Sequence, residues 1–498
     1  MDNNTREQFG SRLGYILVSA GCAIGIGNVW KFPYICGQYG GAIFMLIYLV
    51  FLVILGIPVM TAEFAIGRAS RRSAALAYDA LEPRGTKWHW LRWMSIGGCS
   101  LLMMYYTTVA GWMMNYGFKH IDGAFIGKSP EEVTGGFGTM LGDPLQMVFW
   151  TVLVCLLGFL VCYFGIRKGV ERVTKYMMVL LLALMIVLAV HSVSLEGAAE
   201  GVRYYLVPNL ETVADKGLGA VVFNAMSHAF FTLSIGIGSM LIFGSYIGKD
   251  RSLLGESMVI TGLDTFVALT AGFIIIPSCF AYCVEVGAGP SLIFITIPNL
   301  FTQMPGGRWW GTVFFIFLTF AAMSTVVAVF ENIIAFFMDR FDWSRKKSTL
   351  VSGPAITLLS LPCVFGYNLW SKIQLLGEGS TVLDFEDFIV SNNMLPLGSL
   401  AFVLFCTHKN GWGFENFLAE VNAGKGLKLP SNAVTKFYLT WLLPLVIVAV
   451  YLRGYWDMFK PDVGYDARFF GWMAFAVLFL ALIITISILG GKKRAKTE

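Results

Sequence analysis

The first long apolar segment of the chain is interrupted at residues 21–33 by the run GCAIGIGNVWKFP. Glycine permits backbone conformations that a helix excludes, so this run predicts a helix broken inside a membrane span, with carbonyl and amide groups left without intrahelical partners. Such backbone persists at membrane depth only where it is buried in protein or lines a polar cavity. A glycine-rich helix contact is the plainer interpretation, but it needs neither Asn28 nor Lys31. The run therefore indicates a polar binding site.

Composition places the whole chain in a membrane. Hydrophobic residues make up 56% of the 498 and charged residues 13%, whereas soluble domains carry about 25% charged residues; the mean hydropathy is +0.68. The sequence predicts an all-α membrane protein with twelve transmembrane helices. The segments long enough to cross a hydrocarbon layer of about 30 Å are 13–36, 41–66, 92–118, 146–166, 174–194, 219–247, 255–285, 309–338, 349–369, 384–407, 434–453 and 467–490.

The distribution of basic residues orients these helices. Most of the 36 Lys and Arg residues fall in segments that are cytoplasmic if the N-terminus lies inside, and an excess of Lys and Arg is typical of inner loops. Residues 1–12 are polar, and no signal-peptide cleavage site follows the first apolar run. We expect a multi-pass protein surrounded by lipid in the inner (plasma) membrane of the cell, with both termini cytoplasmic.

The sixth apolar segment repeats the interruption, with FFTLSIGIGS at 230–239. Each broken segment opens a block of five helices, and secondary transporters built from inverted repeats bind substrate where such broken helices meet. Helix breaks offer amide dipoles to a carboxylate and free carbonyls to a hard cation. The predicted organisation is a cytoplasmic N-terminal segment (1–12), a first repeat (13–194), an outer loop (195–218), a second repeat (219–407), a cytoplasmic loop (408–433), helices eleven and twelve (434–490) and a cytoplasmic tail (491–498).

Acids and hydroxyls inside other apolar segments mark further candidate positions. Glu63 lies one helical turn inside the end of the second segment, where it either pairs with Arg68 or accepts hydrogen bonds from the amides of a broken helix. Asp264 lies in the seventh segment. The adjacent Ser324 and Thr325 in the eighth either bond to their own helix carbonyls or complete an oxygen cage for a cation.

Other patterns exclude whole classes of function. The nine cysteines lie in or at the ends of apolar segments, without metal-ligand spacing. Neither a nucleophile–base spacing nor a phosphate loop is found, so we expect neither an enzyme nor a nucleic-acid-binding protein. The loop 287–308 is too apolar for a solvated loop and too short to span, and we expect it to fold back as an outer lid. A transporter, a channel and a ligand sensor stay open at this point.

Six strings, in this order and spacing, resemble the neurotransmitter:sodium symporter family, in particular its bacterial amino-acid transporters. The resemblance covers helices one to ten and implies inward movement of a small amino acid or amine, coupled to the sodium gradient through alternating access. The strings are GCAIGIGNVWKFP, GQYGGAIFMLIY, MTAEFAIGR, FFTLSIGIG, GPSLIFITIPNLF and LDFEDFIVSNNMLPLG.

The resemblance also implies two sodium sites and a substrate pocket. The first sodium would be bound by the substrate carboxylate together with Ala23, Asn28, Thr232 and an acid or amide of the seventh helix, for which Asp264 is the candidate. The second would be bound by the carbonyls of Gly21, Ile24 and Ala321 and by the hydroxyls of Ser324 and Thr325. The substrate pocket would be lined by Cys22, Ala23, Gly25, Ile26, Gly27, Tyr106, Phe231, Thr232, Ser234, Ile237, Thr325 and Val329.

Two gates follow from the same resemblance. Lys31 and Asp387 would form the outer gate, with Phe231 as its aromatic lid, and Arg6 and Asp339 the inner gate, beside Tyr246. Glu63 would cap the broken sixth helix. The sequence departs from the family pattern at three positions, where the usual arginine, tryptophan and amide are replaced by Lys31, Phe9 and His228.

Substrate class and ion requirement follow from single positions. Amine transporters of the family carry an Asp at the position of Gly25, so we expect the substrate to be an amino acid, with an amine as the alternative. The apolar Ile237 and Val329 favour a substrate with a hydrophobic or aromatic side chain. Helix seven can be aligned with the family pattern through Asp264 or through Pro277, and the two alignments differ by three residues. Asp264 is therefore expected to act as a sodium ligand, as a built-in replacement for chloride, or as both. Transport would then be independent of chloride and accompanied by outward proton movement. The sequence does not indicate the oligomeric state.

Overall fold

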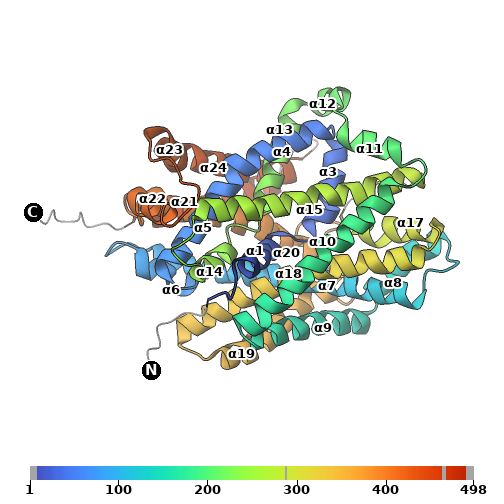
Figure 1. The fold of residues 1–498 in the computed structure, drawn as a ribbon, viewed down its shortest axis with the longest axis horizontal. Helices are drawn as coiled ribbons and strands as arrows, with labels where there is room; N and C mark the ends of the chain where they lie inside the picture. Colours follow the sequence, from blue (N-terminus) through green and yellow to red (C-terminus); the bar gives the residue numbers. More distant parts are fainter. Residues whose placement is uncertain (1–7, 287–288, 462–466, 490–498) are drawn as a thin grey trace, which may run out of the picture.

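The computed structural model describes residues 8–286, 289–461 and 467–489, and these parts are built of helices (Figure 1). An isolated β-bridge joins Arg251 to Lys425. Up to the outer loop before the second broken span, the elements are α1 (Arg12–Ala23), α2 (Gly27–Trp30), α3 (Phe32–Gln38), α4 (Ala42–Phe51), η1 (Leu52–Gly56), α5 (Ile57–Ser70), α6 (Ala74–Leu81), η2 (Trp88–Leu91), α7 (Arg92–Asp122), α8 (Pro130–Gly142), α9 (Pro144–Tyr163), η3 (Ile166–Glu171), α10 (Arg172–Val193), α11 (Ala198–Leu206) and α12 (Leu210–Lys216).

The second part of the chain begins with the other broken span. Its elements are α13 (Leu218–Phe231), α14 (Ser239–Ser245), α15 (Leu253–Ala281), α16 (Gly289–Ser291), η4 (Leu292–Thr296), α17 (Ile297–Gln303), α18 (Gly307–Phe341), α19 (Arg345–Phe365), α20 (Val382–Ile389), η5 (Val390–Met394), α21 (Leu395–Thr407), α22 (Phe414–Val421), α23 (Ala433–Phe437), η6 (Tyr438–Leu442), α24 (Leu443–Phe459) and α25 (Ala467–Ile488).

Helices lie at all twelve predicted spans. Among the described residues, nine helices are long and apolar enough to cross a membrane, and the pair Arg12–Ala23 and Gly27–Gln38, bent by 59°, makes a tenth. The two remaining predicted spans, the third and the sixth, correspond to α7 and to the interrupted pair α13 and α14. The predicted all-helical membrane class is confirmed, and so is the broken first span.

Both interruptions are breaks of the backbone and not merely glycine-rich helix. The first span leaves the helix at Ile24, which has an extended conformation (ψ 92°), and resumes at Gly27. In the sixth span, Ser234, Gly236 and Gly238 have positive φ values of 50°, 102° and 80°. Such values favour glycine, and a Cβ atom at Gly236 would also lie 2.0 Å from the carbonyl oxygen of Leu395. The glycines therefore set where the sixth span opens.

Four of the π-helical turns, η1, η4, η5 and η6, precede a proline at the second position of the next helix. These prolines are Pro58, Pro298, Pro396 and Pro444. Proline has no N–H to donate, and its ring clashes with the carbonyl four residues earlier. A locally wider turn relieves that clash, so the long spans continue past their prolines.

The broken spans lie at the centre of the bundle. Helix α1 packs against α18, α15 and α10, and α14 packs against α5 (Figure 1). Helices α5 and α14 approach so closely that only glycine fits at two positions of the contact. A Cβ atom at Gly67 would lie 1.8 Å from the carbonyl oxygen of Leu241, and one at Gly244 would lie 2.5 Å from that of Phe64. Small residues of this kind allow helices to approach closely in membranes. The second half of the sixth span is thereby fixed to the second span.

The segment expected to form an outer lid is helical over its described residues. Elements α16, η4 and α17 cover 289–303, while residues 287–288 lie outside the described part. Leu292, Ile293 and Phe294 are fully buried, and the segment packs against α8, α15 and α18. Burial of these apolar side chains explains why so short a loop is so hydrophobic.

Candidate functional site

The break in the first span lies beside polar side chains of the sixth and seventh spans. The Asn28 side-chain nitrogen donates to Asp264 Oδ1 at 2.8 Å and to Thr232 Oγ1 at 3.3 Å. Thr232 Oγ1 donates to Asp264 Oδ2 at 3.0 Å, and the Gly25 amide donates to Asn28 Oδ1 at 3.2 Å. All three side chains are buried. Their oxygens form a cluster, called here the first oxygen cluster.

The first oxygen cluster is electrostatically unbalanced. Both carboxylate oxygens of Asp264 accept hydrogen bonds from neutral side chains, and no cationic side chain pairs with Asp264 in the parts of the chain that the structure describes. A buried charge without a counter-charge is costly. The site therefore favours a cation, and carboxylate, amide and hydroxyl oxygens are the ligands of hard cations.

A second oxygen cluster lies where α18 passes the same break. Ser324 Oγ donates to the carbonyl oxygens of Gly21 at 3.0 Å and Ala321 at 2.9 Å. Thr325 Oγ1 lies 3.1 Å from the Gly21 oxygen, 3.3 Å from the Ile24 oxygen and 3.5 Å from the Ala321 oxygen. All five groups assigned to the second sodium by resemblance thus lie together, in a buried position.

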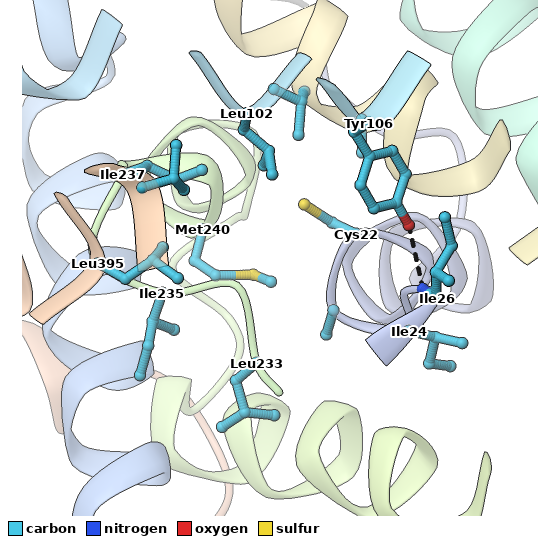
Figure 2. Close-up of a cluster of buried hydrophobic side chains, with 14 of the residues drawn as sticks. Cys22, Ile24, Ile26, Leu102, Tyr106, Leu233, Ile235, Ile237, Met240 and Leu395 are labelled. Atoms are coloured by element: carbon cyan, nitrogen blue, oxygen red, sulfur yellow. Dashed lines mark hydrogen bonds between the residues drawn. The ribbon is translucent and has the colours of Figure 1, made fainter. Parts of the chain in front are cut away.

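The residues between the two broken spans are mostly apolar, with a few polar contacts (Figure 2). Tyr106 points from α7 to the first break, where its hydroxyl accepts a hydrogen bond of 3.2 Å from the Ile26 amide. A Cβ atom at Gly25 would lie 3.2 Å from that hydroxyl, so a side chain at this position would crowd Tyr106. Figure 2 shows Cys22 and Ile26 on one side of this region and Ile237 and Met240 on the other.

The other expected pocket residues belong to the same elements. Ala23 ends α1 and Gly27 begins α2. Phe231 ends α13 and Ser234 lies in the break of the sixth span. Val329 is buried on α18, one helical turn after Thr325.

Glu63 bridges the second span to the sixth. Its two carboxylate oxygens accept hydrogen bonds from the amides of Gly236 and Met240, at the end of the sixth-span break and the start of α14. Arg68, the other partner considered from the sequence, instead pairs with Glu420 at 2.6 Å. A fully buried carboxylate that accepts from free helix amides stabilises the start of a helix.

The two charged residues expected at the outer gate, Lys31 and Asp387, do not pair with one another. Asp387 accepts hydrogen bonds from Tyr105 at 2.8 Å and Ser391 at 2.7 Å, and the described residues show no ion pair between Lys31 and Asp387. The Lys31 ammonium instead lies 5.5 Å from the centre of the Phe231 ring. Lys31 and Phe231 line a cavity of about 520 Å³. In this conformation the outer side of the site is therefore not closed by a Lys31–Asp387 ion pair.

The residues expected at the opposite end, the inner gate, are placed in part by the structure. Arg6 lies outside the described residues, and Asp339 accepts a hydrogen bond of 2.6 Å from the Ser73 amide. The Phe9 ring lies edge-on to the Tyr246 ring, with centroids 5.6 Å apart. Phe9 therefore provides an aromatic contact at the base of α1, where the family usually has a tryptophan.

Two further acids lie at this end: the sequence places Glu331 on the eighth helix below Ser324 and Thr325 without a role, and sequence reasoning missed Glu171. Glu331 forms a double ion pair with Arg345, at 2.6 and 3.0 Å, and accepts a hydrogen bond of 2.8 Å from Tyr246. Glu171 accepts from the Gly10 amide at 2.6 Å and from the Ser11 amide at 3.0 Å, which attaches the start of α1 to η3. The signal that identified Glu63, an acid near the end of an apolar segment, was present at both positions.

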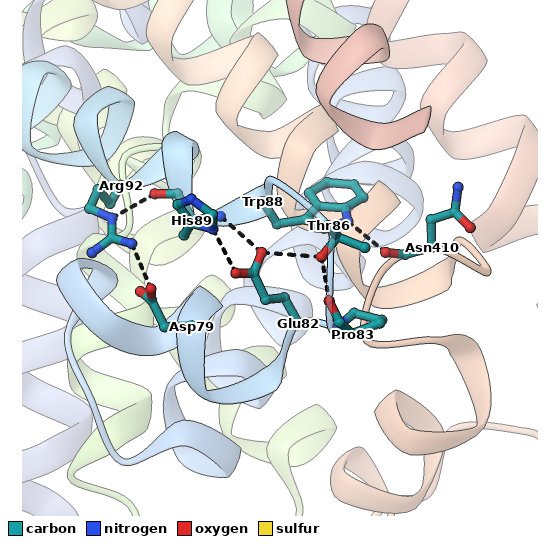
Figure 3. A network of polar contacts seen from close by, with 8 residues as sticks. All are labelled: Asp79, Glu82, Pro83, Thr86, Trp88, His89, Arg92 and Asn410. Atoms are coloured by element: carbon teal, nitrogen blue, oxygen red, sulfur yellow. Dashed lines mark hydrogen bonds and ion pairs between the residues drawn. The ribbon is translucent and has the colours of Figure 1, made fainter. Parts of the chain in front are cut away.

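A polar network outside the site joins α6 and η2 to the loop after α21 (Figure 3). Ligand atoms of Asp79, Glu82 and His89 lie within 4.8 Å of one another. His89 Nδ1 already lies 2.6 Å from Glu82, and Arg92 pairs with Asp79 at 2.7 Å. The arginine neutralises the acid that a metal would need. We therefore interpret the cluster as structural.

The chain is similar to known proteins along most of its length. The model of the sodium:neurotransmitter symporter family matches residues 6–126 and 141–493. An uncharacterized sodium-dependent transporter, YhdH of Bacillus subtilis (strain 168), is 33% identical over 459 residues, which cover 91% of this chain and 98% of YhdH. A sodium-dependent serotonin transporter of Drosophila melanogaster is 26% identical over 94% of this chain and 80% of its own length.

Among solved structures, the chain resembles the crystal structure of MhsT in complex with L-phenylalanine. The TM-score is 0.79 at 36% sequence identity, and the match covers 90% of this chain and 99% of that one. This likeness confirms the predicted fold class, with two five-helix repeats that each open on a broken helix.

Proposed function

The chain belongs to the sodium:neurotransmitter symporter family, and on that premise we propose that it imports a hydrophobic or aromatic L-amino acid together with two sodium ions by alternating access. Family membership makes the protein a multi-pass, sodium-dependent membrane transporter and not an enzyme. The number of ions, the substrate and the direction of transport are the parts that we propose.

The observation that carries the proposal is the pair of oxygen clusters at one helix break. The first contains a carboxylate, an amide oxygen and a hydroxyl, and the second contains three carbonyls and two hydroxyls. Both sets suit a hard monovalent cation. Because both use the backbone or side chains of residues 21–28, cation binding at either cluster would order the segment that also borders the substrate region. This shared segment supplies a physical route for coupling.

An amino-acid substrate is supported by the space around Gly25. An acid at this position would crowd the Tyr106 hydroxyl, and glycine leaves room for a substrate carboxylate to approach the first oxygen cluster. The facing side chains of Cys22, Ile237 and Met240 are apolar or weakly polar and buried, which favours a hydrophobic or aromatic substrate. The similar MhsT structure contains L-phenylalanine.

Chloride independence is supported by Asp264. The carboxylate would provide at the first cluster the negative charge that chloride-dependent transporters of this family take from solution. When the sodium ions leave, this buried carboxylate loses its counter-charge, and a proton would replace it. We therefore include proton counter-movement in the proposal, with Asp264 as both sodium ligand and replacement for chloride.

Orientation is supported by the basic residues. The described residues at one end of the bundle include Arg71, Arg72, Arg251 and the run Arg345-Lys346-Lys347. We propose that this end faces the cytoplasm, with both termini on that side, in the plasma membrane.

The experiment that tests the substrate assignment is a binding screen with the purified protein. The twenty amino acids and simple amines, including tryptamine, are compared with sodium and with potassium. Sodium-dependent binding of phenylalanine, tryptophan or leucine is expected. Tight binding of tryptamine without binding of tryptophan would instead support the amine alternative.

A further inference from the structure

A separate cavity of about 230 Å³ lies at the base of α1, and none of the residues of the two oxygen clusters lines it. We call it the base cavity. It is lined by Gln8, Phe9, Gly10, Ser11, Arg12, Tyr15, Tyr246, Ile247, Gly248, Asp250, Arg251 and Glu256. The residues come from the start of the chain, from the loop after α14 and from α15, so a ligand here would touch three elements at once.

One wall of the base cavity has an acid with an unused oxygen. The Glu256 side chain is only 4% exposed, and its Oε1 accepts a hydrogen bond of 3.0 Å from Arg12. Its Oε2 has no hydrogen-bond partner among the described residues, and neither has the hydroxyl of Tyr15, which lines the same cavity. Leaving a buried acceptor unpaired costs free energy, most of all for a charged group. The two atoms therefore fit a ligand that brings hydrogen-bond donors, such as an ammonium group.

The other walls complement the remainder of such a ligand. Phe9 contacts both Tyr15 and Tyr246, with ring centroids 5.7 and 5.6 Å apart. An aromatic wall of this kind accepts an apolar side chain and also attracts an ammonium group. The Arg251 side chain, 46% exposed, lines the cavity and pairs through its Nε with Asp250 at 3.2 Å, which leaves its terminal guanidinium nitrogens for a carboxylate.

We propose that the base cavity is a second, sodium-independent binding site for a zwitterionic amino acid. The ammonium group would bind Glu256 and Tyr15, the carboxylate would bind Arg251, and the side chain would pack against Phe9. The zwitterion is chosen over a simple cation because the charged side chains around the cavity are two acids and two arginines. The choice of an amino acid rests on the proposed function, because the ligand is the product that import would release on this side.

Occupancy would have a consequence for transport. A ligand in the base cavity would join the start of α1, through Phe9 and Arg12, to α15 through Glu256. Opening of this end requires these elements to separate. The site would therefore slow release when the imported amino acid accumulates.

The test separates the two sites by their need for sodium. Binding of L-phenylalanine to the full-length protein is measured by saturation-transfer NMR in potassium buffer and again in sodium buffer. In potassium we expect weak binding, no binding of 3-phenylpropionate, which lacks the ammonium group, and an affinity about tenfold lower in Glu256→Gln because a charged hydrogen bond is lost. Tyr15→Phe removes only the tyrosine hydroxyl and leaves Glu256 in place, and we expect the affinity in potassium to fall about fivefold.

Two matched variants serve as controls. Glu415→Gln changes an acid whose side chain is 77% exposed and pairs with Lys436 outside the base cavity, and should leave binding in potassium unchanged. The double variant Ser324→Ala with Thr325→Ala should lose the sodium-dependent binding, while the weak binding that the wild type shows in potassium should persist in both buffers. Sodium-dependent binding by Glu256→Gln and Tyr15→Phe shows that these variants are folded.

The outcomes distinguish this inference from the proposed function. Wild-type protein that binds phenylalanine in sodium but not in potassium would overturn the second site and leave the transporter assignment intact. Binding in potassium that survives both Glu256→Gln and Tyr15→Phe would also overturn it, because the ligand would then lie elsewhere. Absence of any sodium-dependent amino-acid binding would instead contradict the proposed function.

Discussion

The side-chain nitrogen of Asn28 donates a hydrogen bond of 2.8 Å to the carboxylate of Asp264. This contact brings an acid of the seventh span to the break in the first. Thr232 donates to the other oxygen of the same carboxylate, so Asp264 joins the three broken or adjoining spans at one point. In the proposed function, the ion requirement of the transporter depends on this pair.

Chloride should be dispensable for the wild-type protein. Since Asp264 supplies a negative charge at the first oxygen cluster, replacing chloride by gluconate should leave vesicle uptake of the amino acid nearly unchanged. In Asp264→Ser the charge is gone, and uptake should require chloride. Strong loss of wild-type uptake in gluconate would contradict the assignment, and a serine variant inactive in both anions would leave Asp264 as an indispensable sodium ligand.

The second oxygen cluster should be necessary for transport. Ser324→Ala with Thr325→Ala leaves a cation only the three carbonyls, whereas hard cations take about six oxygens. Uptake should fall to background while the amount of protein in the membrane stays normal, as measured by immunoblot of the same vesicles. An unchanged dependence of uptake rate on sodium concentration in this variant would exclude the cluster as an ion site.

The outer gate should tolerate a change of its cation better than loss of its acid. A partly hydrated pair contributes about 0–1 kcal/mol, and Lys31 already interacts with the Phe231 ring. Lys31→Arg should therefore keep or increase uptake, since arginine can bind a carboxylate with two parallel hydrogen bonds. Asp387→Ala should reduce uptake more than equilibrium binding. Equal loss of binding in Lys31→Ala and Asp387→Ala would indicate that Lys31 contacts the substrate.

Glu63 should matter for stability as well as for transport. In Glu63→Gln one amide donor of the sixth-span break loses its charged acceptor, which costs about 1.5–3 kcal/mol for a hydrogen bond to an ion. We expect a lower midpoint of thermal unfolding in detergent and reduced uptake. Glu415→Gln, which changes an exposed acid, is the control and should leave the midpoint unchanged. A Glu63→Gln variant as stable as the wild type would argue against the capping role.

The parts of the fold that follow from local chemistry were predictable from sequence. Three glycines within residues 21–27 and a second glycine-rich run in the sixth apolar segment indicated the breaks, because few other residues accept such backbone. Ser324 and Thr325 were identified because paired hydroxyls are unusual inside an apolar helix. The wider turns before Pro58, Pro298, Pro396 and Pro444 were not predicted, because an apolar pattern reads the same through a π-turn as through an α-helix.

Long-range partners were the part that sequence could not provide. Glu63 had two possible partners, and only the fold shows that it reaches Gly236 and Met240 while Arg68 reaches Glu420. Asp387 was expected to pair with Lys31, and the fold instead gives it Tyr105 and Ser391 as partners. Glu331 and Arg345 pair across the turn between α18 and α19, which a reading of separate helices does not reveal.

The most direct test of sodium-coupled import is concentrative uptake into proteoliposomes loaded with potassium. Labelled L-phenylalanine is added outside with sodium, and the sodium gradient is the only driving force. The account predicts accumulation above the external concentration, its collapse when a sodium ionophore is added, and its absence in Ser324→Ala with Thr325→Ala. Uptake that stops at equal concentrations inside and outside, or that persists without a sodium gradient, would contradict it.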